Sequence, residues 1–396
     1  MKRQSFVTNL TCWKTGKSYE PDRLLNLSDA GKPLRVEYDL SAIRDVFTRQ
    51  MLDERPAGLW AWRELLPLPL DCEPTTLGEG ATPLLGADNL AKEIGVRKLW
   101  VKDEAVNPTG SFKARGMAAA IAMAAHFGVT EAAVPSAGNA GGALSAYAAA
   151  AGIKAHVFMP RDVPAANRLE CELAGAQVTL VDGLITDCGA AAKKACDEHG
   201  WFDVSTLKEP YRVEGKKTMG LELARQLGWR VPDVILYPTG GGTGLVGMDK
   251  AFDELEALGW IDSKRPRFVS VQAEHCCPIV TAHRAGAAEC AAHENARTCA
   301  AGLRVPKAIG DFIMLEILKR TDGTAVAVAD ANMIADARAL GARTGVCACP
   351  EGGACLAALR ELRSSGWARP DDEVVLFNTG SGLKYAEAFA SYATSA

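Results

Sequence analysis

The feature that most constrains the fold of this chain is an alternation of short apolar runs with alanine-rich stretches of helical length, which starts near Lys98. Short apolar runs predict strands, and the stretches between them predict helices. Strands that alternate with helices form βαβ units and parallel sheets, and such sheets bind ligands outside the carboxyl ends of their strands. We therefore expect an α/β protein whose functional residues follow strand ends. The predicted strands are residues 97–102, 131–135, 153–159, 176–182, 201–205, 233–237, 267–273, 324–328 and 373–378.

Composition places the chain among globular proteins with room for two domains that share a cleft. It has 396 residues, of which 48% are hydrophobic and 23% are charged. The net charge of -4 gives no basis for binding nucleic acid or a membrane surface. No apolar run approaches the roughly 20 residues that span a bilayer, and residues 1–5 lead into no apolar signal core. We expect a cytoplasmic protein that acts on small molecules. Its 12 cysteines are scattered through predicted core elements, which favours reduced, buried thiols over disulfides.

A lysine at the start of a helix is the most informative residue of the chain. Asn107 to Gly110 has the composition of a turn, because proline fixes φ and glycine tolerates positive φ, and Ser111 can then cap a helix from about Phe112 to Phe127. Lys113 lies in the first turn of this predicted helix, where unpaired N–H groups and the helix dipole disfavour an ammonium group. A lysine in such surroundings can lose its proton and act as a nucleophile or form a Schiff base. The alternative is an ordinary lysine on a solvated helix face.

A glycine-rich loop, Ser136 to Gly142, follows the predicted strand 131–135 and precedes a helix that we expect to start near Ala143. Its glycines allow backbone N–H groups to approach a carboxylate closely. The alternative is a strand-to-helix turn built from small residues, and the residues alone leave both interpretations open.

A second glycine-rich loop, Pro238 to Gly244, follows the apolar strand that ends at Tyr237 and leads into a helix. Successive glycine N–H groups at a helix N-terminus form a cradle for an anion such as a phosphate. The identity of the anion is open, because Gly242 to Gly247 also matches the G-x-G-x-x-G dinucleotide fingerprint, with Glu274 at the end of the following strand. This pattern indicates a nicotinamide-dependent oxidoreductase as a rival. Against it, the fingerprint lies past the middle of the chain and leaves the lysine stretch unexplained.

Asn107 to Gly116, which reads NPTGSFKARG, resembles the lysine motif of the fold-type II pyridoxal-phosphate enzymes, and among them that of the threonine synthases. Ser136 to Asn139, Gly240 to Gly244 and Asn378 to Lys384 resemble further motifs of these enzymes, in the same order along the chain. The resemblance extends from about Gly78 to Lys384. In that family the lysine holds the cofactor as an imine.

The resemblance implies a fold of two three-layer αβα domains with largely parallel sheets. It implies a large cofactor-binding domain made of residues 78–111 and 214–396, and a small mobile domain of residues 112–213. Residues 1–77 form an N-terminal arm that resembles a degenerate zinc ribbon and that we expect to pack as a short hairpin. Only Cys12 remains of the ribbon's thiolates, and a structural zinc needs four nitrogen or sulfur ligands, so we predict no metal.

The resemblance also implies roles for the site residues. Asn139 contacts the ring hydroxyl of the cofactor, and Thr379 faces its pyridine nitrogen, where a neutral hydroxyl does not enforce protonation of the ring. Arg212 grips a second phosphate, on the substrate, unless it is only the solvated start of a helix. Glu351 either contacts the ring face or is simply an acid in a first helical turn. The expected cofactor-binding residues are Lys113, Phe112, Asn139, Gly240, Gly241, Gly242, Thr243, Gly244, Glu351 and Thr379, and the expected substrate-binding residues are Thr82, Ser136, Ala137, Gly138, Asn139, Ser205 and Arg212.

The activity implied by the resemblance is that of a threonine synthase, a lyase that converts O-phospho-L-homoserine and water to L-threonine and phosphate. Fold-type II enzymes are usually homodimers, so we expect a dimer. Two departures favour a threonine or serine dehydratase instead: Ala137 stands where many threonine synthases have a threonine, and Gly240 to Gly244 lacks the asparagines of their loop. A β-replacement enzyme and a pyridoxal-binding scaffold with an unreactive Lys113 are further alternatives.

Overall fold

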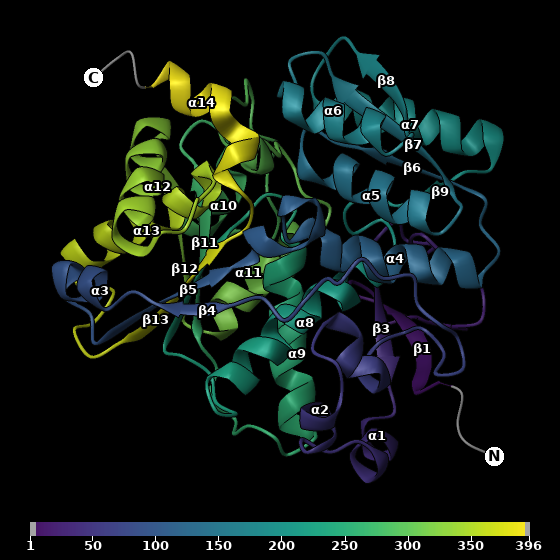
Figure 1. The fold of residues 1–396 in the computed structure, drawn as a ribbon, viewed down its shortest axis with the longest axis horizontal. Helices are drawn as coiled ribbons and strands as arrows, with labels where there is room; N and C mark the ends of the chain where they lie inside the picture. Colours follow the sequence, from purple (N-terminus) through teal and green to yellow (C-terminus); the bar gives the residue numbers. More distant parts are fainter. Residues whose placement is uncertain (1–4, 393–396) are drawn as a thin grey trace. The chain divides into compact units, whose positions relative to one another are not determined.

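All nine predicted strands form in the computed structural model, which describes residues 5–392, and each lies close to its predicted limits. The contacts among the residues divide the chain into two compact units. The first contains the chain up to residue 81 together with residues 113–222 and 246–262, and the second contains residues 82–112, 223–245 and the chain from residue 263 onward. Each unit is built around its own parallel sheet (Figure 1).

The second unit alternates strands and helices around one six-stranded sheet. Its elements are β4 (Leu84–Gly86), α3 (Asp88–Ile94), β5 (Lys98–Asp103), η2 (Glu104–Val106), η3 (Pro108–Gly110), β10 (Val234–Pro238), β11 (Arg267–Ala273), α10 (Pro278–Arg284), η4 (Ala301–Leu303), α11 (Asp311–Arg320), β12 (Thr324–Val328), α12 (Asp330–Thr344), α13 (Pro350–Ser364), β13 (Glu373–Asn378), η5 (Gly382–Tyr385) and α14 (Ala386–Ser391). The strand order is β12-β11-β10-β13-β5-β4, and only the short edge strand β4 runs antiparallel. This order places β5, β13 and β10 side by side, so the loops at their carboxyl ends meet at one edge of the sheet (Figure 1).

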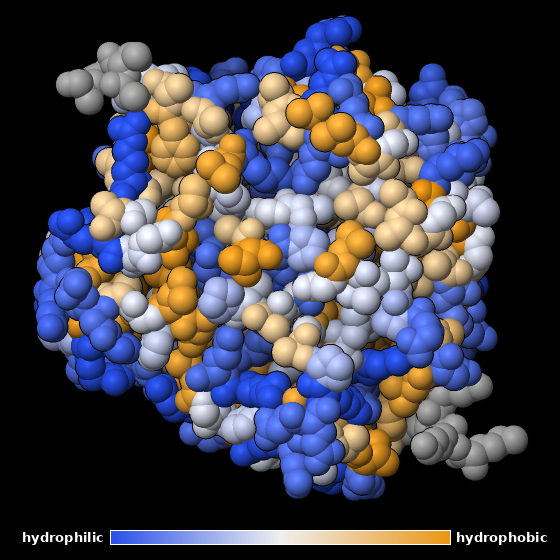
Figure 2. Space-filling view, in the orientation of Figure 1, coloured by the Kyte–Doolittle hydropathy of each residue, from blue (hydrophilic) through white to orange (hydrophobic). Residues whose placement is uncertain are grey.

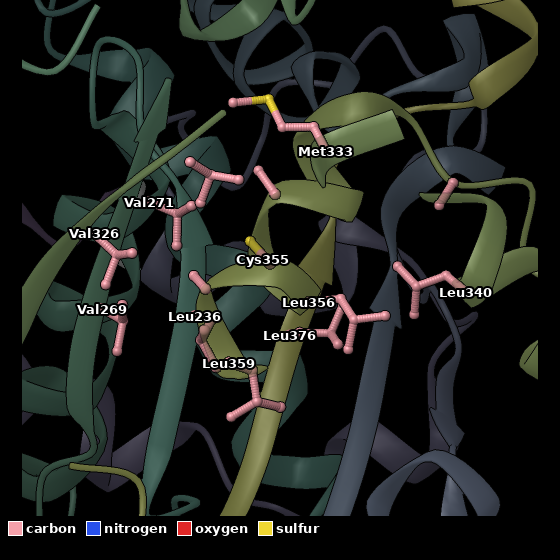
Figure 3. Packing of buried hydrophobic residues seen from close by; sticks show 14 of the residues in the cluster. Leu236, Val269, Val271, Val326, Met333, Leu340, Cys355, Leu356, Leu359 and Leu376 are labelled. Carbon is pink, nitrogen blue, oxygen red and sulfur yellow. The ribbon is translucent and has the colours of Figure 1, made fainter. Parts of the chain in front are cut away.

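Both faces of this sheet are buried, as a three-layer fold requires. Side chains alternate along a strand, so Val234 and Leu236 of β10 point to one face while Ile235 and Tyr237 point to the other, and all four are at most 1% exposed. Burial on both faces makes the sheet a rigid support for its strand-end loops. Figure 3 shows the first face, where strands, α12 and α13 contribute Leu236, Val269, Val271, Val326, Leu376, Met333, Leu340, Cys355, Leu356 and Leu359.

Helix α3 illustrates the amphipathic pattern that lets a helix cover such a sheet. Leu90 and Ala91 are buried and belong to the core that the strands share. Gly95 follows in the left-handed conformation, with φ of 86°, and its N–H donates to the carbonyl of Ala91, which ends the helix. The exposed positions are Asp88, Asn89, Lys92 and Glu93. Figure 2 shows largely hydrophilic surface where α3 lies in Figure 1.

The first unit holds the four-stranded parallel sheet and most of the N-terminal part of the chain. Its elements are β1 (Val7–Cys12), β2 (Ser18–Tyr19), β3 (Leu34–Tyr38), α1 (Leu40–Val46), α2 (Met51–Glu54), η1 (Leu59–Leu65), α4 (Lys113–His126), β6 (Glu131–Pro135), α5 (Asn139–Ala150), β7 (Lys154–Pro160), α6 (Ala165–Leu173), β8 (Gln177–Val181), α7 (Ile185–His199), β9 (Phe202–Asp203) and most of α8 (Tyr211–Gln226) and α9 (Thr243–Ala257). The strand order is β8-β7-β6-β9. Val134 and Val157 pack with α4 and α5 on one face, and Ala133 and Phe158 pack with α7 on the other, so this sheet too is covered on both sides.

The N-terminal segment forms the predicted hairpin of β1 and β2, and β3 adds a third antiparallel strand beside β1. Cys12 is 1% exposed, and its Sγ lies 3.1 Å from Ser28 Oγ. Burial opposes ionisation of this thiol, but hydrogen bonds with Ser28 and Thr15 lower its pKa to about 7. Within the described part of the chain, no three His, Cys, Asp or Glu side chains gather as a metal ion would require. Hydroxyl groups therefore surround the cysteine where a zinc ion would need nitrogen or sulfur ligands.

A buried cluster of charged side chains ties β3 to α8 and α9 in the first unit. Glu214 accepts hydrogen bonds from Tyr38 Oη at 2.8 Å and from Lys217 Nζ at 2.6 Å, and it also pairs with Lys250. Glu254 lies 2.8 Å from Lys217 Nζ and 3.3 Å from Lys250 Nζ. The four charged side chains are each at most 4% exposed, so each charge depends on its partners.

Two composition-based predictions can be compared with this fold. Among residues 5–392, no helix combines the length and the apolar content that crossing a bilayer requires. All 12 cysteines are free thiols and most of them are buried, in agreement with the prediction.

The predicted limits of the small domain, residues 112–213, stay a prediction, because the first unit contains almost all of these residues together with the N-terminal segment and residues 246–262.

We predict that Lys250→Met destabilises the protein, because methionine keeps the length of the side chain but leaves Glu214 and Glu254 with one buried cation fewer. The free energy of unfolding should fall by about 3–5 kcal/mol, measured by urea denaturation. The control is Lys193→Met, since Lys193 also pairs with a residue four positions along its helix, Asp197, but both of these side chains are 64% exposed. The control should cost less than about 0.5 kcal/mol. Equal losses in the two variants would contradict a role for burial.

Candidate active site

The loops that follow β5 and β13 pair with each other in the second unit. Ser111 and Gly380 form an antiparallel bridge, and the N–H of Phe112 donates to the carbonyl of Thr379 at 3.0 Å. Phe112 directly precedes Lys113 in the chain. Backbone hydrogen bonds therefore bring two of the predicted motifs together and fix the residue before Lys113 to the end of β13.

The turn before Lys113 contains two consecutive residues in the left-handed conformation. Gly110 has φ of 60°, as a glycine turn favours, and Thr109 has φ of 62°, which non-glycine residues rarely adopt. Asn107 holds the turn by donating to the backbone carbonyl of Glu104 at 3.0 Å and to its carboxylate at 2.8 Å. Helix α4 begins at Lys113, one residue later than predicted, and Lys113 is half-buried.

Aromatic side chains line the same strand ends. The ring of Phe112 meets the ring of Tyr237 edge-on with centroids 6.1 Å apart, and Tyr237 meets Phe377 in the same way at 5.5 Å. The Tyr237 hydroxyl is buried and has no hydrogen-bond partner among residues 5–392. Burial raises the pKa of Tyr237 well above its usual value, so the group stays a neutral hydroxyl. A buried hydroxyl without a protein partner can serve a ligand at this edge of the sheet.

The loop from β10 to α9 needs its glycines for close packing. Gly242 has φ of 79°, and a Cβ there would lie 2.0 Å from Met314 Sδ. A Cβ on Gly240 would lie 2.3 Å from the carbonyl oxygen of Gly302. Helix α9 begins at Thr243, so the loop ends at a helix N-terminus whose first N–H groups have no helical partner. This arrangement suits an anion such as a phosphate.

Glu351 holds the backbone segment that packs against the glycine loop. It is 3% exposed in the first turn of α13, and its Oε1 accepts hydrogen bonds from the N–H of Gly302 at 2.9 Å and from Tyr385 Oη at 2.6 Å. Gly302 is the residue whose carbonyl packs against Gly240. Glu351 Oε2 is buried without a partner in the part of the chain that the structure describes. Glu351 is thus a first-turn acid with a packing role, and its contact with a cofactor ring stays a prediction.

The loop from β6 to α5 carries four of the predicted substrate contacts, Ser136 to Asn139. Ser136 Oγ donates to the carbonyl of Gly138 at 2.7 Å and accepts from the N–H of Gly141 at 2.9 Å. Helix α5 begins at Asn139, before the predicted start near Ala143, because this hydroxyl closes the turn early. Asn139 therefore stands in the first turn of α5, at the positive end of the helix dipole, which favours a negative charge such as a carboxylate.

Helices α4 and α8 cross where each has a glycine. A Cβ on Gly215 would lie 2.0 Å from the carbonyl oxygen of Arg115, and a Cβ on Gly116 would lie 3.2 Å from the carbonyl oxygen of Arg212. The two helices can approach this closely only without side chains at the crossing. The backbone of Arg212 therefore contacts α4 within one turn of Lys113.

Arg212 is buried but only partly satisfied by the protein. It is 1% exposed, its Nη1 donates to the carbonyl of Val204 at 2.7 Å, and its Nε and Nη2 have no partner among the described residues. Beside it, Glu209 accepts the backbone N–H of Arg212 at 3.1 Å, and burial raises the pKa of this carboxyl to about 7. A buried guanidinium with two unmatched nitrogen atoms suits a bound anion.

Two predicted substrate contacts have hydroxyl groups that other residues already use. Thr82 is fully buried, and its Oγ1 donates to Glu104 Oε1 at 2.6 Å. Ser205 is 5% exposed, and its Oγ donates to Asp203. Contacts of these two residues with a substrate stay predictions.

Some residues around these loops escaped prediction. Arg115 pairs with both carboxylate oxygens of Glu222 at 2.7 Å and joins α4 to α8 beside Lys113. Glu170 of α6 lies over the first turn of α5, where a Cβ on Gly142 would be 1.8 Å from its Oε2. Their partners lie far away in the chain, which no local pattern encodes. The one available signal was Arg115 itself, a charged residue inside an otherwise apolar, alanine-rich helix.

Comparisons with known proteins show what this chain is similar to. Residues 75–380 match the family of pyridoxal-phosphate dependent enzymes. The chain is 33% identical over 378 residues to a threonine synthase of Methanocaldococcus jannaschii, covering 95% of this chain and 93% of that protein. It is 35% identical over 378 residues to a threonine synthase of Methanosarcina acetivorans, covering 95% and 92%.

Solved structures agree at the level of the fold. A threonine deaminase from T.th. superposes with a TM-score of 0.64 and 27% identity, over 76% of this chain and 92% of that one. Maize serine racemase superposes with a TM-score of 0.66 and 22% identity, over 79% and 92%. This second similarity shows the fold alone.

We predict that Gly240→Ala destabilises the second unit, because the new methyl group would meet the rigid backbone carbonyl of Gly302. The free energy of unfolding should fall by about 1–3 kcal/mol, measured by thermal or urea denaturation. The control is Gly341→Ala in α12, where a Cβ would make only an ordinary contact of 3.5 Å with the carbonyl oxygen of Val346. That change should be neutral or stabilising, since alanine favours a helix interior. A Gly240→Ala variant as stable as the parent would contradict the packing described here.

Proposed function

The chain belongs to the threonine synthases, which are pyridoxal-phosphate-dependent enzymes, and on that premise we propose a role for each residue of its candidate active site. The chain is a carbon-oxygen lyase of amino-acid biosynthesis that converts O-phospho-L-homoserine and water to L-threonine and phosphate. The nicotinamide-dependent alternative falls away, because the matched family uses pyridoxal phosphate.

The side chains and N–H groups at the strand ends fit pyridoxal phosphate. Lys113 would hold it covalently through Nζ, and the N–H groups of Gly240 to Gly244 would receive its phosphate at the start of α9. Thr379 would face its pyridine nitrogen, and Asn139 would contact its ring hydroxyl. Bound pyridoxal phosphate supplies an electron sink, which makes the hydrogens near the amino-bearing carbon of an attached amino acid removable.

Lys113 is proposed to carry the protons of the reaction. With the substrate bound, Lys113 Nζ would take a proton from the α-carbon of the substrate, then one from the β-carbon, and later return protons to the product. The first turn of α4 favours the unprotonated amine, because the helix dipole disfavours a cation there. The hydrogen bond from the N–H of Phe112 to the carbonyl of Thr379 keeps the backbone beside the lysine fixed while its side chain changes partners.

The observation that carries the choice of substrate is the buried Arg212. The glycine crossing of α4 and α8 brings the backbone of Arg212 against α4 within one helical turn of Lys113, and two of its guanidinium nitrogens have no partner among the described residues. A substrate phosphate would supply acceptors for these two nitrogens. The first turn of α5, with Ser136 to Asn139 before and within it, would receive the substrate's carboxylate.

Dehydration of threonine or serine is the second candidate activity. It is favoured by the loops, because Ala137 and Gly240 to Gly244 offer few side-chain donors to a second phosphate. Neither of those substrates carries a phosphate, however, so dehydration would leave Nε and Nη2 of the buried Arg212 without an acceptor among the described residues. We therefore rank it below the synthase reaction.

We also propose that the enzyme acts in the cytoplasm as a homodimer and that residues 112–213 move as a small domain during turnover. These proposals rest on resemblance to other fold-type II enzymes. Light scattering coupled to gel filtration measures the oligomeric state directly, since a monomer of 42.0 kDa and a dimer separate clearly.

We predict that Lys113→Ala abolishes covalent cofactor binding. The parent should have an absorbance band near the edge of the visible range that borohydride removes, and the variant should lack it. Phosphate release from O-phospho-L-homoserine should fall at least about 100-fold, since the variant loses its general base. Lys92→Ala, an exposed change on α3, is the control and should keep the band. A borohydride-sensitive band in Lys113→Ala would contradict the assignment.

We predict that Arg212→Ala selectively impairs the phosphorylated substrate. The kcat/KM for O-phospho-L-homoserine should fall about 10- to 100-fold, as expected for loss of a hydrogen bond to a charged group. Formation of 2-oxo acid from threonine, which has no phosphate, should change little. Arg212→Lys keeps a buried cation but loses the planar guanidinium that can bind a phosphate through two nitrogens. Its kcat/KM for O-phospho-L-homoserine should lie between those of the parent and the alanine variant. Equal losses on both substrates would show that Arg212 has only a structural role.

A further inference from the structure

Cys349 lies against the residue proposed to face the cofactor's pyridine nitrogen. It is the residue that precedes the first turn of α13, it is 1% exposed, and all of its neighbours discussed here belong to the second unit. Its Sγ lies 3.4 Å from Asn378 Oδ1 and 3.9 Å from Thr379 Oγ1. The thiol thus touches the last residue of β13 and the hydroxyl that follows it.

The orientation of the Asn378 amide decides which way the thiol proton points. Asn378 Nδ2 donates to Asp103 Oδ1 at 2.8 Å, so Oδ1 faces α13, where it accepts the backbone N–H of Cys349 at 3.1 Å. A Cβ on Gly352 would lie 2.5 Å from this oxygen, so glycine in the first turn makes room for it. An amide oxygen can only accept, and the thiol at 3.4 Å is therefore the donor.

The thiol is protonated when it makes this bond. Burial raises the pKa of Cys349 well above its usual value, and the negative charge of Glu351 adds to the effect. With its proton directed at Asn378, the sulfur presents only lone pairs to Thr379 Oγ1. Sulfur is a weak acceptor, and 3.9 Å is long for such a bond, so it competes poorly for the hydroxyl proton.

We infer that Cys349 is a positioning residue for the cofactor: its thiol fixes Asn378, packs against Thr379 and leaves the Thr379 hydroxyl proton for the pyridine nitrogen. This inference rests on the proposed function, in which Thr379 faces that nitrogen. Because the hydroxyl then donates to an unprotonated nitrogen, the ring stays neutral there. A thiol favours this hydrogen bond from Thr379 to the pyridine nitrogen more than a carboxylate would, since a carboxylate beside Thr379 would accept the hydroxyl proton itself.

The test compares two substitutions of Cys349 with a matched change on the same helix. Cys355 is also fully buried on α13 but lies among the core residues of the sheet, as Figure 3 shows. Cys349→Ala, Cys349→Ser and Cys355→Ala are each freed of cofactor and titrated with pyridoxal phosphate. The readouts are the dissociation constant, the position of the borohydride-sensitive absorbance band and the melting temperature of the cofactor-free protein.

Cys349→Ala should raise the dissociation constant about three- to tenfold, the effect of one hydrogen bond, and should shift the band. Cys349→Ser restores a donor to Asn378 and should bind within about twofold of the parent. Cys355→Ala should lower the melting temperature and leave the dissociation constant and the band unchanged. An unchanged constant and band in Cys349→Ala, or an equal change in Cys355→Ala, would overturn the inference. A parent without a borohydride-sensitive band would instead overturn the proposed function itself.

Discussion

The backbone pairing of residues 110–112 with residues 379–381 is the contact on which the candidate active site depends. It consists of the Ser111–Gly380 bridge and the hydrogen bonds of Phe112 and Ser381 to carbonyls on the opposite segment. The segments belong to neighbouring parallel strands, β5 and β13, and are far apart in the sequence. Because β13 is buried along its whole length and the last three residues of β5 are buried, the loops cannot separate without breaking the sheet. The residue before Lys113 is therefore as fixed as the core.

Buried charge plays a different part in the first unit. The cluster of Glu214, Lys217, Lys250 and Glu254 has no access to solvent, and such clusters add less net stability than apolar residues of the same size. They do raise the free energy of any arrangement of these elements that leaves one buried charge without a partner. The cluster therefore fixes how β3 meets α8 and α9, and α8 is the helix that carries Arg212. In this way the N-terminal segment helps to specify the position of the helix that carries Arg212, the proposed binding residue.

The strands could be predicted from the sequence because period and length are local properties, and the motif loops because they follow strand ends. What could not be predicted depends on distant partners. Helix α5 starts at Asn139 because the Ser136 hydroxyl closes the turn, which the glycines alone do not reveal. Glu351 was expected near a ring, yet it also supports Gly302, and that contact needs the fold. In the sequence, nothing distinguishes Cys349 from the other cysteines. Only the fold shows that it contacts Asn378 and Thr379.

The source of substrate specificity follows from what the loops lack. Ala137 and the glycines of residues 240–244 provide backbone N–H groups but few side-chain donors, so they serve anions that any pyridoxal-phosphate enzyme must hold. A second phosphate then has to be recognised elsewhere. In the function proposed here, Arg212 would meet that need from a helix crossing, where Gly116 and Gly215 permit close approach. Such recognition would tolerate changes in the loops but not at Gly215, because a Cβ there would lie 2.0 Å from the carbonyl oxygen of Arg115 and would separate α8, which carries Arg212, from the helix that begins with Lys113.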